Sequence, residues 1–161
     1  HRLDTPTSGL VLAARNKETF LSLSALQEKD EIKKVYMAQV SQTREIDEGF
    51  EAFPFDLKGK NLQIISSFRS FGPKGASVRP LWEKRKGDER IYRTHVEYVS
   101  EERVKCTITR GFRHQIRSHL AWSGHPIVGD ERYGGKENDF LLLEAVSISF
   151  PYKKGVLEIS I

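Results

Sequence analysis

Alternating apolar and polar positions mark two strands in the middle of the chain. In residues 92–98 and 104–109, side chains suited to a protein core recur at every second position, with charged or polar side chains between them. Successive side chains of a strand point to opposite faces, so this period of two predicts strands with one face toward a core. More continuous apolar runs predict four further strands, at 35–40, 62–65, 140–150 and 156–161.

The N-terminal part of the chain predicts a turn, a short strand and a helix. Thr5–Gly9 is dense in turn-forming residues, and the apolar run Leu10–Ala14 predicts a buried strand. Asn16 can cap a helix that begins at Lys17 and ends near residues 29–30. Apolar side chains at three- and four-residue spacing give this helix one apolar face.

A second helix is predicted from His114 to Trp122, where Ser123–Gly124 ends it. Two glycine-punctuated segments, 72–88 and 124–135, are predicted to be loops. Strands outnumber helices and fall in runs, without strict alternation between the two. This order favours an α+β fold, with a mixed, mostly antiparallel sheet and a few flanking helices, in one domain that spans residues 1–161.

The charge of the chain is compatible with a nucleic-acid partner. Its 161 residues carry a net charge of +4, and the isoelectric point is about 9.2. Basic residues gather with glycine and aromatic residues in two stretches, Lys58–Arg79 and Lys84–Arg93. Such stretches can hold a polyanion through its phosphates, and two solvated loops are the alternative interpretation.

The composition also limits the class of protein. A single cysteine, Cys106, excludes an internal disulfide framework and a cysteine-rich zinc site, and a reducing cytoplasmic location is the default expectation. No apolar run approaches the ~18 residues of a membrane span, so no membrane association is expected. The spacing of His114, His119 and His125 does not put them on one helix face, and we expect no metal site.

Three segments together resemble one enzyme family. His1–Leu10 resembles the HRLDxxTSGL signature of the RluA-type pseudouridine synthases, and Lys34–Ala38 is similar to their KxYxA segment. Residues 114–134 are similar to their HQIRxHLAxxGHPIxGDxxYG block. The segments occur in the order of the family and extend over nearly the whole chain.

The resemblance implies an enzyme that isomerises uridine to pseudouridine in structured RNA without a cofactor. Ribosomal RNA is favoured over transfer RNA as the expected substrate. By analogy Asp4 is the essential carboxylate, which either attacks the anomeric carbon of the sugar or removes a sugar proton. Arg117 matches the family position that pairs with this carboxylate, where a guanidinium opposes the effect of burial on a carboxylate. Tyr36 matches the active-site tyrosine, which stacks on the uracil and whose hydroxyl can act as a base.

Four further residues are assigned to RNA or uracil binding from the same resemblance. Arg2 is a candidate to fill the stack that an extruded uridine leaves, and Leu143 is a candidate wall of the uracil pocket. His114 and Gln115 stand at the predicted helix N-terminus, where backbone amides favour an anion.

The chain departs from the family pattern in several places. The family has strands and a KPxG-containing stretch before HRLD, so we expect an N-terminally incomplete catalytic domain whose catalytic loop lacks support. Phe112 and Arg113 replace the middle residues of the family's GRTH, and Glu144 replaces the histidine of its LHA. No S4-like domain is recognised, and a monomer is expected.

Two alternatives remain open at this point. The chain can be a catalytically incomplete RNA-binding module with a synthase fold, which would bind uridine-containing RNA without converting it. Without the resemblance, its histidines can be interpreted as part of a metal-dependent hydrolase, which a metal analysis would detect.

Overall fold

A computed structural model of the chain describes residues 1–42, 59–82 and 90–161. In chain order its elements are β1 (Ser8–Gly9), α1 (Lys17–Glu28), β2 (Lys33–Gln39), β3 (Leu62–Phe71), η1 (Pro73–Gly75), β4 (Ser77–Leu81), β5 (Tyr92–Ser100), β6 (Arg103–Ile108), α2 (Gln115–Trp122), η2 (Glu131–Tyr133), β7 (Leu143–Tyr152) and β8 (Gly155–Ser160).

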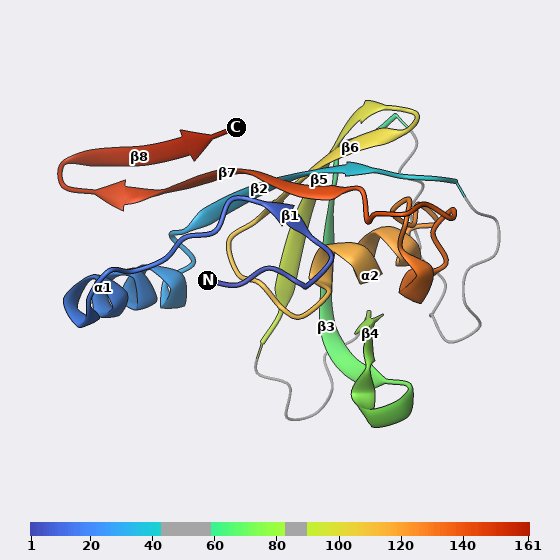
Figure 1. The fold of residues 1–161 in the computed structure, drawn as a ribbon, viewed down its shortest axis with the longest axis horizontal. Coiled ribbons are helices and arrows are strands. Elements are labelled where there is room, and N and C mark those ends of the chain that lie inside the picture. Colours follow the sequence, from blue (N-terminus) through green and yellow to red (C-terminus); the bar gives the residue numbers. More distant parts are fainter. Residues whose placement is uncertain (43–58, 83–89) are drawn as a thin grey trace.

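The described strands form one mixed sheet, which confirms the predicted α+β fold. The strand order is β1-β7-β2-β6-β5-β3-β4 (Figure 1). The last strand, β8, pairs with β7 further along that strand than β1 does. The β1–β7 pairing is parallel, whereas the other strand pairs are antiparallel. The alternation predicted for 92–98 and 104–109 is confirmed, because Val96, Val104 and Cys106 are buried in the main core.

The helix α2 packs against the sheet and is buried on all sides. Each of its eight residues is buried, including Gln115, Arg117 and His119. The His119 ring bonds to Ser66 on β3 at 2.9 Å and to Thr94 on β5 at 2.8 Å. The polar side chains of α2 are therefore satisfied inside the fold, as buried polar groups require.

The helix α1 begins as predicted but buries little of its surface. The Asn16 side chain accepts a hydrogen bond of 2.8 Å from the Thr19 amide, which confirms the cap. Leu23 and Leu26 contact a small core cluster formed by Ile32, Ile148 and Phe150. Phe20, which belongs to the predicted apolar face, is 60% exposed. No helix in the described ranges is long and apolar enough to cross a membrane.

The prediction of a buried strand at Leu10–Ala14 is wrong. The strand is Ser8–Gly9, within the segment predicted as a turn, and Leu10–Ala14 forms no regular element. Gly9 has a φ of 101°, and a Cβ there would lie 2.3 Å from the carbonyl oxygen of Ala145. Only glycine permits this close approach, so the chain can pair with β7 at Gly9. The pairing ends at the next residue, where the Leu10 amide donates to the Ala145 carbonyl.

The prediction of a loop at 72–88 is also wrong in its first part. This segment contains η1 and β4, and β4 pairs with β3 as an antiparallel hairpin. Two contacts from outside the hairpin hold it in place: the Val78 amide donates to the Tyr133 hydroxyl at 3.0 Å, and the Arg113 guanidinium donates to the Gly75 carbonyl. Residues 83–89 lie outside the described residues.

Candidate active site

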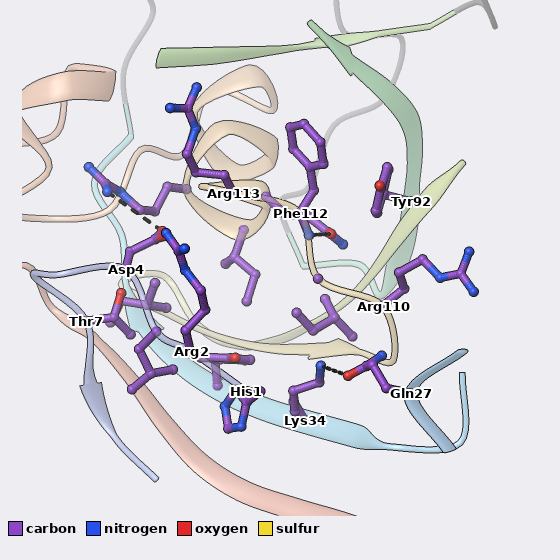
Figure 2. Close-up of a pocket in the computed structure, with 18 of the residues that line it drawn as sticks. His1, Arg2, Asp4, Thr7, Gln27, Lys34, Tyr92, Arg110, Phe112 and Arg113 are labelled. Atoms are coloured by element: carbon purple, nitrogen blue, oxygen red, sulfur yellow. Dashed lines mark hydrogen bonds and ion pairs between the residues drawn. The ribbon is translucent and has the colours of Figure 1, made fainter. Parts of the chain in front are cut away.

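A cleft of about 600 Å³ opens on one side of the sheet (Figure 2). Residues 1–4 form one wall, β2 contributes Lys34 and Tyr36, and residues 108–117 form the opposite wall. Two hydrogen bonds between His1 and Leu12, of 2.7 and 3.1 Å, hold the first wall. A turn bond from the Thr7 amide to the Asp4 carbonyl, of 2.9 Å, fixes the chain after Asp4.

Arg117 joins two carboxylates at this cleft. Its Nε and Nη2 atoms each lie 2.7 Å from an oxygen of Asp130, and its Nη1 lies 3.8 Å from Asp4 Oδ2. The sequence predicts the Asp4 partner, but the two-point grip falls on Asp130. Burial lowers the pKa of Arg117, but the bonds and charge of Asp130, together with Asp4, outweigh burial and raise it.

Asp130 is held inside a tight loop between α2 and β7. Its side chain has no exposed surface, and its carbonyl accepts bonds from the Tyr133 and Gly135 amides. A Cβ at Gly129 would lie 1.9 Å from the Phe140 carbonyl oxygen, and one at Gly135 would lie 1.9 Å from that of Ile127. These glycines allow the loop to close around Asp130.

Tyr36 and Leu143 lie on neighbouring strands and both line the cleft. Both residues are buried, and the ladder between β2 and β7 shifts register at Val35/Tyr36. Burial, and after it the charge of Asp4, raises the pKa of Tyr36 to about 12. The Tyr36 hydroxyl therefore keeps its proton at neutral pH.

Gln115 lines the cleft, but its amide is engaged within the protein. Its oxygen accepts from the Phe112 amide at 2.9 Å, and its nitrogen donates to the Arg93 carbonyl and to Thr94 Oγ1, both at 3.0 Å. These bonds fasten the wall that contains Phe112 to β5. The bound amide thus shapes the cleft and offers few free groups to a ligand.

His114 is not among the residues that line the cleft. It adopts a left-handed backbone conformation with a φ of 55°, and its Nδ1 lies 3.0 Å from the Tyr133 hydroxyl. Because that hydroxyl accepts from the Val78 amide, its own hydrogen is available for Nδ1. Burial and the charge of Arg117 lower the pKa of His114, which agrees with a neutral ring that accepts at Nδ1.

The cleft is strongly basic. Its lining includes six lysine and arginine side chains but two carboxylate side chains, Asp4 and Glu28. Arg2 is exposed at the same side of the cleft as Asp4, and Arg110 and Arg113 extend from the opposite wall (Figure 2). Of the predicted stretch Lys84–Arg93, residues 84–89 lie outside the described residues, as does Lys58 of the other stretch.

Sequence reasoning assigned no role to Lys34, Asp130 or Tyr133, although all three stand within the motifs that carry the resemblance. The amine of Lys34 donates to Gln27 Oε1 at 2.7 Å, and Gln27 Nε2 donates to the Thr109 carbonyl at 2.8 Å. Burial lowers the pKa of Lys34 to about 8, and the charge of Asp30 acts in the opposite direction.

The three histidines considered for a metal site have separate surroundings. His114 contacts Tyr133, and His119 bonds to Ser66 and Thr94. His125 Nδ1 lies 2.9 Å from the Ser123 carbonyl. Within residues 1–42, 59–82 and 90–161, no three His, Cys, Asp or Glu side chains come together as metal ligands.

Comparison with known proteins gives one consistent family. Residues 1–122 match the family model described as RNA pseudouridylate synthase. Over 145 residues the chain is 29% identical to the ribosomal large subunit pseudouridine synthase C of Escherichia coli (strain K12), covering 90% of this chain and 42% of that protein. It is 30% identical to an uncharacterized RNA pseudouridine synthase of Helicobacter pylori, covering 99% of this chain and 55% of that protein. The chain thus spans about half the length of these relatives.

Solved structures agree on the fold. Human RNA pseudouridylate synthase domain containing 1 superimposes with a TM-score of 0.74 at 22% identity, over 100% of this chain and 66% of that one. Human RNA pseudouridylate synthase domain containing 4 gives a TM-score of 0.72 at 16% identity, over 100% of this chain and 69% of that one.

Proposed function

The chain belongs to the RNA pseudouridylate synthase family, and we propose that it carries the site of an RNA pseudouridine synthase whose essential carboxylate is Asp4. The observation that carries the proposal is the position of Asp4 at the edge of a basic cleft, 3.8 Å from Arg117 and beside Tyr36.

The proposed reaction is an isomerisation that balances without a cofactor. The N1–C1′ bond of uridine breaks, the uracil turns, and a C5–C1′ bond forms. The proton on C5 is released, and N1 gains a proton. Asp4 serves this sequence either by attacking C1′ and later leaving, or by removing a sugar proton to give a glycal-like intermediate and later returning it.

Arg117 keeps Asp4 ionised and fixed in place in this scheme. A carboxylate in a closed cleft tends to take up a proton, and a neighbouring guanidinium opposes that tendency. Asp130 holds Arg117 through two hydrogen bonds, so the orientation of the guanidinium does not depend on Asp4. Asp4 is then free to move during the reaction without releasing Arg117.

Tyr36 and Leu143 form the proposed uracil platform. The raised pKa of Tyr36 favours a ring that stacks and a hydroxyl that donates a hydrogen bond over a phenolate that acts as a base in the free enzyme. Tyr36 can remove the C5 proton once its own proton has passed to the detached uracil, which must gain one at N1. Leu143 is buried next to it and supplies an apolar wall.

The basic rim of the cleft is proposed to hold the RNA. The target uridine must leave its helix, at a cost of ~a few kcal/mol, and Arg2 is proposed to stack in its place. His114 and Gln115 are proposed to support the RNA-binding wall. Ribosomal RNA is the proposed substrate class, because the name of the Escherichia coli relative specifies the ribosomal large subunit. The proposed setting is a cytoplasmic monomer.

Tritium release is a direct test of the proposal. Ribosomal and transfer RNA transcripts labelled with tritium at C5 of uracil are incubated with the protein, and release of tritium to water reports conversion. We expect release from a ribosomal transcript, and none from the Asp4→Asn variant, which keeps its RNA affinity and its fold. RNA binding without release from any transcript would support the alternative of an RNA-binding module. Substantial turnover by Asp4→Asn would remove Asp4 from the mechanism.

A further inference from the structure

Lys34 is a buried cation at the cleft that forms no close ion pair with a described side chain, although the charge of Asp30 acts on it from a greater distance. It is 4% exposed, and an ammonium group offers three hydrogen-bond donors. One of them is directed at Gln27 Oε1, a neutral acceptor, at 2.7 Å. In the part of the chain that the structure describes, the ion pairs of 4 Å or less involve other side chains, and none includes Lys34.

An unbalanced buried charge is unfavourable for folding. Removing an ammonium group from water costs several kcal/mol unless a counter-charge compensates it. A methionine would occupy similar space on β2 without this cost. A residue that lowers the stability of the unliganded protein in this way is typical of a functional site, where a ligand supplies the missing charge.

The neighbours of Lys34 fix its amine toward the cleft. Gln27 Nε2 donates to the Thr109 carbonyl at 2.8 Å, and this bond orients the Gln27 oxygen toward the Lys34 amine. Arg110 is held at the same end of the cleft through Asp30 Oδ1 at 2.8 Å and the Glu28 carbonyl at 2.9 Å. In Figure 2, Lys34, Gln27 and Arg110 lie on one side of the cleft and Asp4 on the other.

Lys34 is also placed at a suitable separation from the proposed uracil platform. Lys34 and Tyr36 are two residues apart on β2, so their side chains lie on the same face, on the order of 7 Å apart along the strand. A uracil that rests on Tyr36 therefore leaves the Lys34 amine beyond the ring, where the sugar–phosphate chain of the bound RNA can pass.

We propose that Lys34, oriented by Gln27, binds a phosphodiester of the RNA next to the target uridine. This inference rests on the proposed function and names a further substrate-binding residue of the same site. A phosphate carries the full negative charge that the buried ammonium lacks, whereas a uracil carbonyl would leave that charge uncompensated. A charge-assisted bond to phosphate is also among the stronger hydrogen bonds in proteins.

A binding cycle with a neutral linkage tests this assignment. The probe is an RNA stem–loop with one uridine in its loop, made with natural linkages or with a single uncharged methylphosphonate at each linkage around that uridine. All proteins carry Asp4→Asn, so that turnover cannot change the probe. The Lys34→Met variant is compared with Lys33→Met, a matched control because Lys33 is adjacent on β2 but exposed on the opposite face.

The expected result is a coupling between one linkage and one lysine. Lys34→Met weakens binding of the natural RNA about 10- to 100-fold, the range expected for a hydrogen bond to a charged group. One methylphosphonate weakens binding to the Lys34 protein by a similar factor and has no further effect on Lys34→Met. Lys33→Met leaves this linkage effect unchanged. Equal linkage effects with and without Lys34, at every position, would overturn the proposal.

A purely structural role for Lys34 predicts a different pattern. If Lys34 serves only to hold α1 through Gln27, then Lys34→Met and Gln27→Leu lower the thermal midpoint alike, and neither shows a preference for a linkage. On our proposal, Lys34→Met retains or gains thermal stability and loses the linkage effect. Tritium release by the proteins with intact Asp4 is measured separately. Coupling without release keeps the phosphate site and rejects the synthase function, whereas release without coupling rejects only the phosphate site.

Discussion

Asp130 grips Arg117 through two hydrogen bonds of 2.7 Å, while Asp4 lies 3.8 Å from the remaining terminal nitrogen of the same guanidinium. The carboxylate of Asp130 has no exposed surface, whereas that of Asp4 is 21% exposed. The arrangement separates two tasks. Asp130 fixes and neutralises the arginine, and Asp4 remains accessible to a ligand in the cleft.

The Asp130→Asn variant is predicted to weaken both the fold and the site. The introduced amide would retain one acceptor but would leave the buried guanidinium without its main counter-charge, and the loss of one partner of a buried ion pair costs roughly 3–5 kcal/mol. Denaturant unfolding should show this loss in the free energy of unfolding. The control is Glu131→Gln, an exposed neighbour on η2, which should change stability little. Equal stability of the Asp130 and Glu131 variants would contradict this account of Asp130.

The Arg117→Lys variant is predicted to reduce the rate of the chemical step. Lysine keeps the charge but cannot hold Asp130 with two nitrogens and face Asp4 with a third. Loss of one positioned hydrogen-bond donor in an active site typically lowers the rate by about 10²–10³-fold. Single-turnover tritium release with saturating protein isolates this step from RNA binding. A near-normal single-turnover rate would mean that Arg117 has a structural role in α2 alone.

RNA binding is predicted to weaken steadily as the salt concentration rises. Among the described residues, six basic and two acidic side chains line the cleft, and each phosphate contact adds about 0.7–0.9 to the slope of log affinity against log salt. The Arg110→Gln and Arg113→Gln variants should each lower the magnitude of this slope by the contribution of about one phosphate contact. Binding titrations at several salt concentrations measure it, and a flat response would point to a ligand that is not a nucleic acid.

The fold could be predicted from the sequence where the signal is local. Alternation along β5 and β6 and the Asn16 cap depend on nearby residues, and these predictions are confirmed. The strand β1 could not be found in this way, because it has two residues and exists only through pairing with Glu144 and Ala145 far along the chain. The strand β4 was hidden for the same reason, since a charged, proline-containing segment becomes a strand by pairing with β3.

The candidate site shows the same limit. The sequence selected seven site residues, of which the structure brings six to one cleft: Arg2, Asp4, Tyr36, Gln115, Arg117 and Leu143. The seventh, His114, does not line it. Their chemical roles remain predictions. The competition of Asp130 with Asp4 for Arg117 was not visible in the sequence, because it depends on how Gly129 and Gly135 let a loop close. The burial of Lys34 likewise depends on packing between β2 and α1 through Gln27.

The free energy of unfolding is predicted to depend on pH because Lys34 carries a buried charge. Its pKa is about 8 in the folded protein and near 10.5 in the unfolded chain. Between these values the unfolded state binds more protons, so this group makes the protein more stable as pH rises from 8 to 10.5. Below pH 8 the whole penalty is present, on the order of 3 kcal/mol.

The Lys34→Met variant should remove this dependence. At pH 7 the free energy of unfolding of the variant should be about 2 kcal/mol higher than that of the parent. Removal of the buried charge contributes about 3 kcal/mol, and the lost bond to Gln27 offsets about 1 kcal/mol of it. The advantage should shrink as pH rises from 8, and above pH 10.5 it should give way to a deficit of about 1 kcal/mol, the lost bond to Gln27. Other lysines and tyrosines titrate in this range, so the difference between the two proteins is the quantity to follow, by urea unfolding at closely spaced pH values. A difference that stays constant from about pH 7 to 10.5 would mean that the Lys34 amine is hydrated in the free protein, and the physical argument for a phosphate partner would lose its basis.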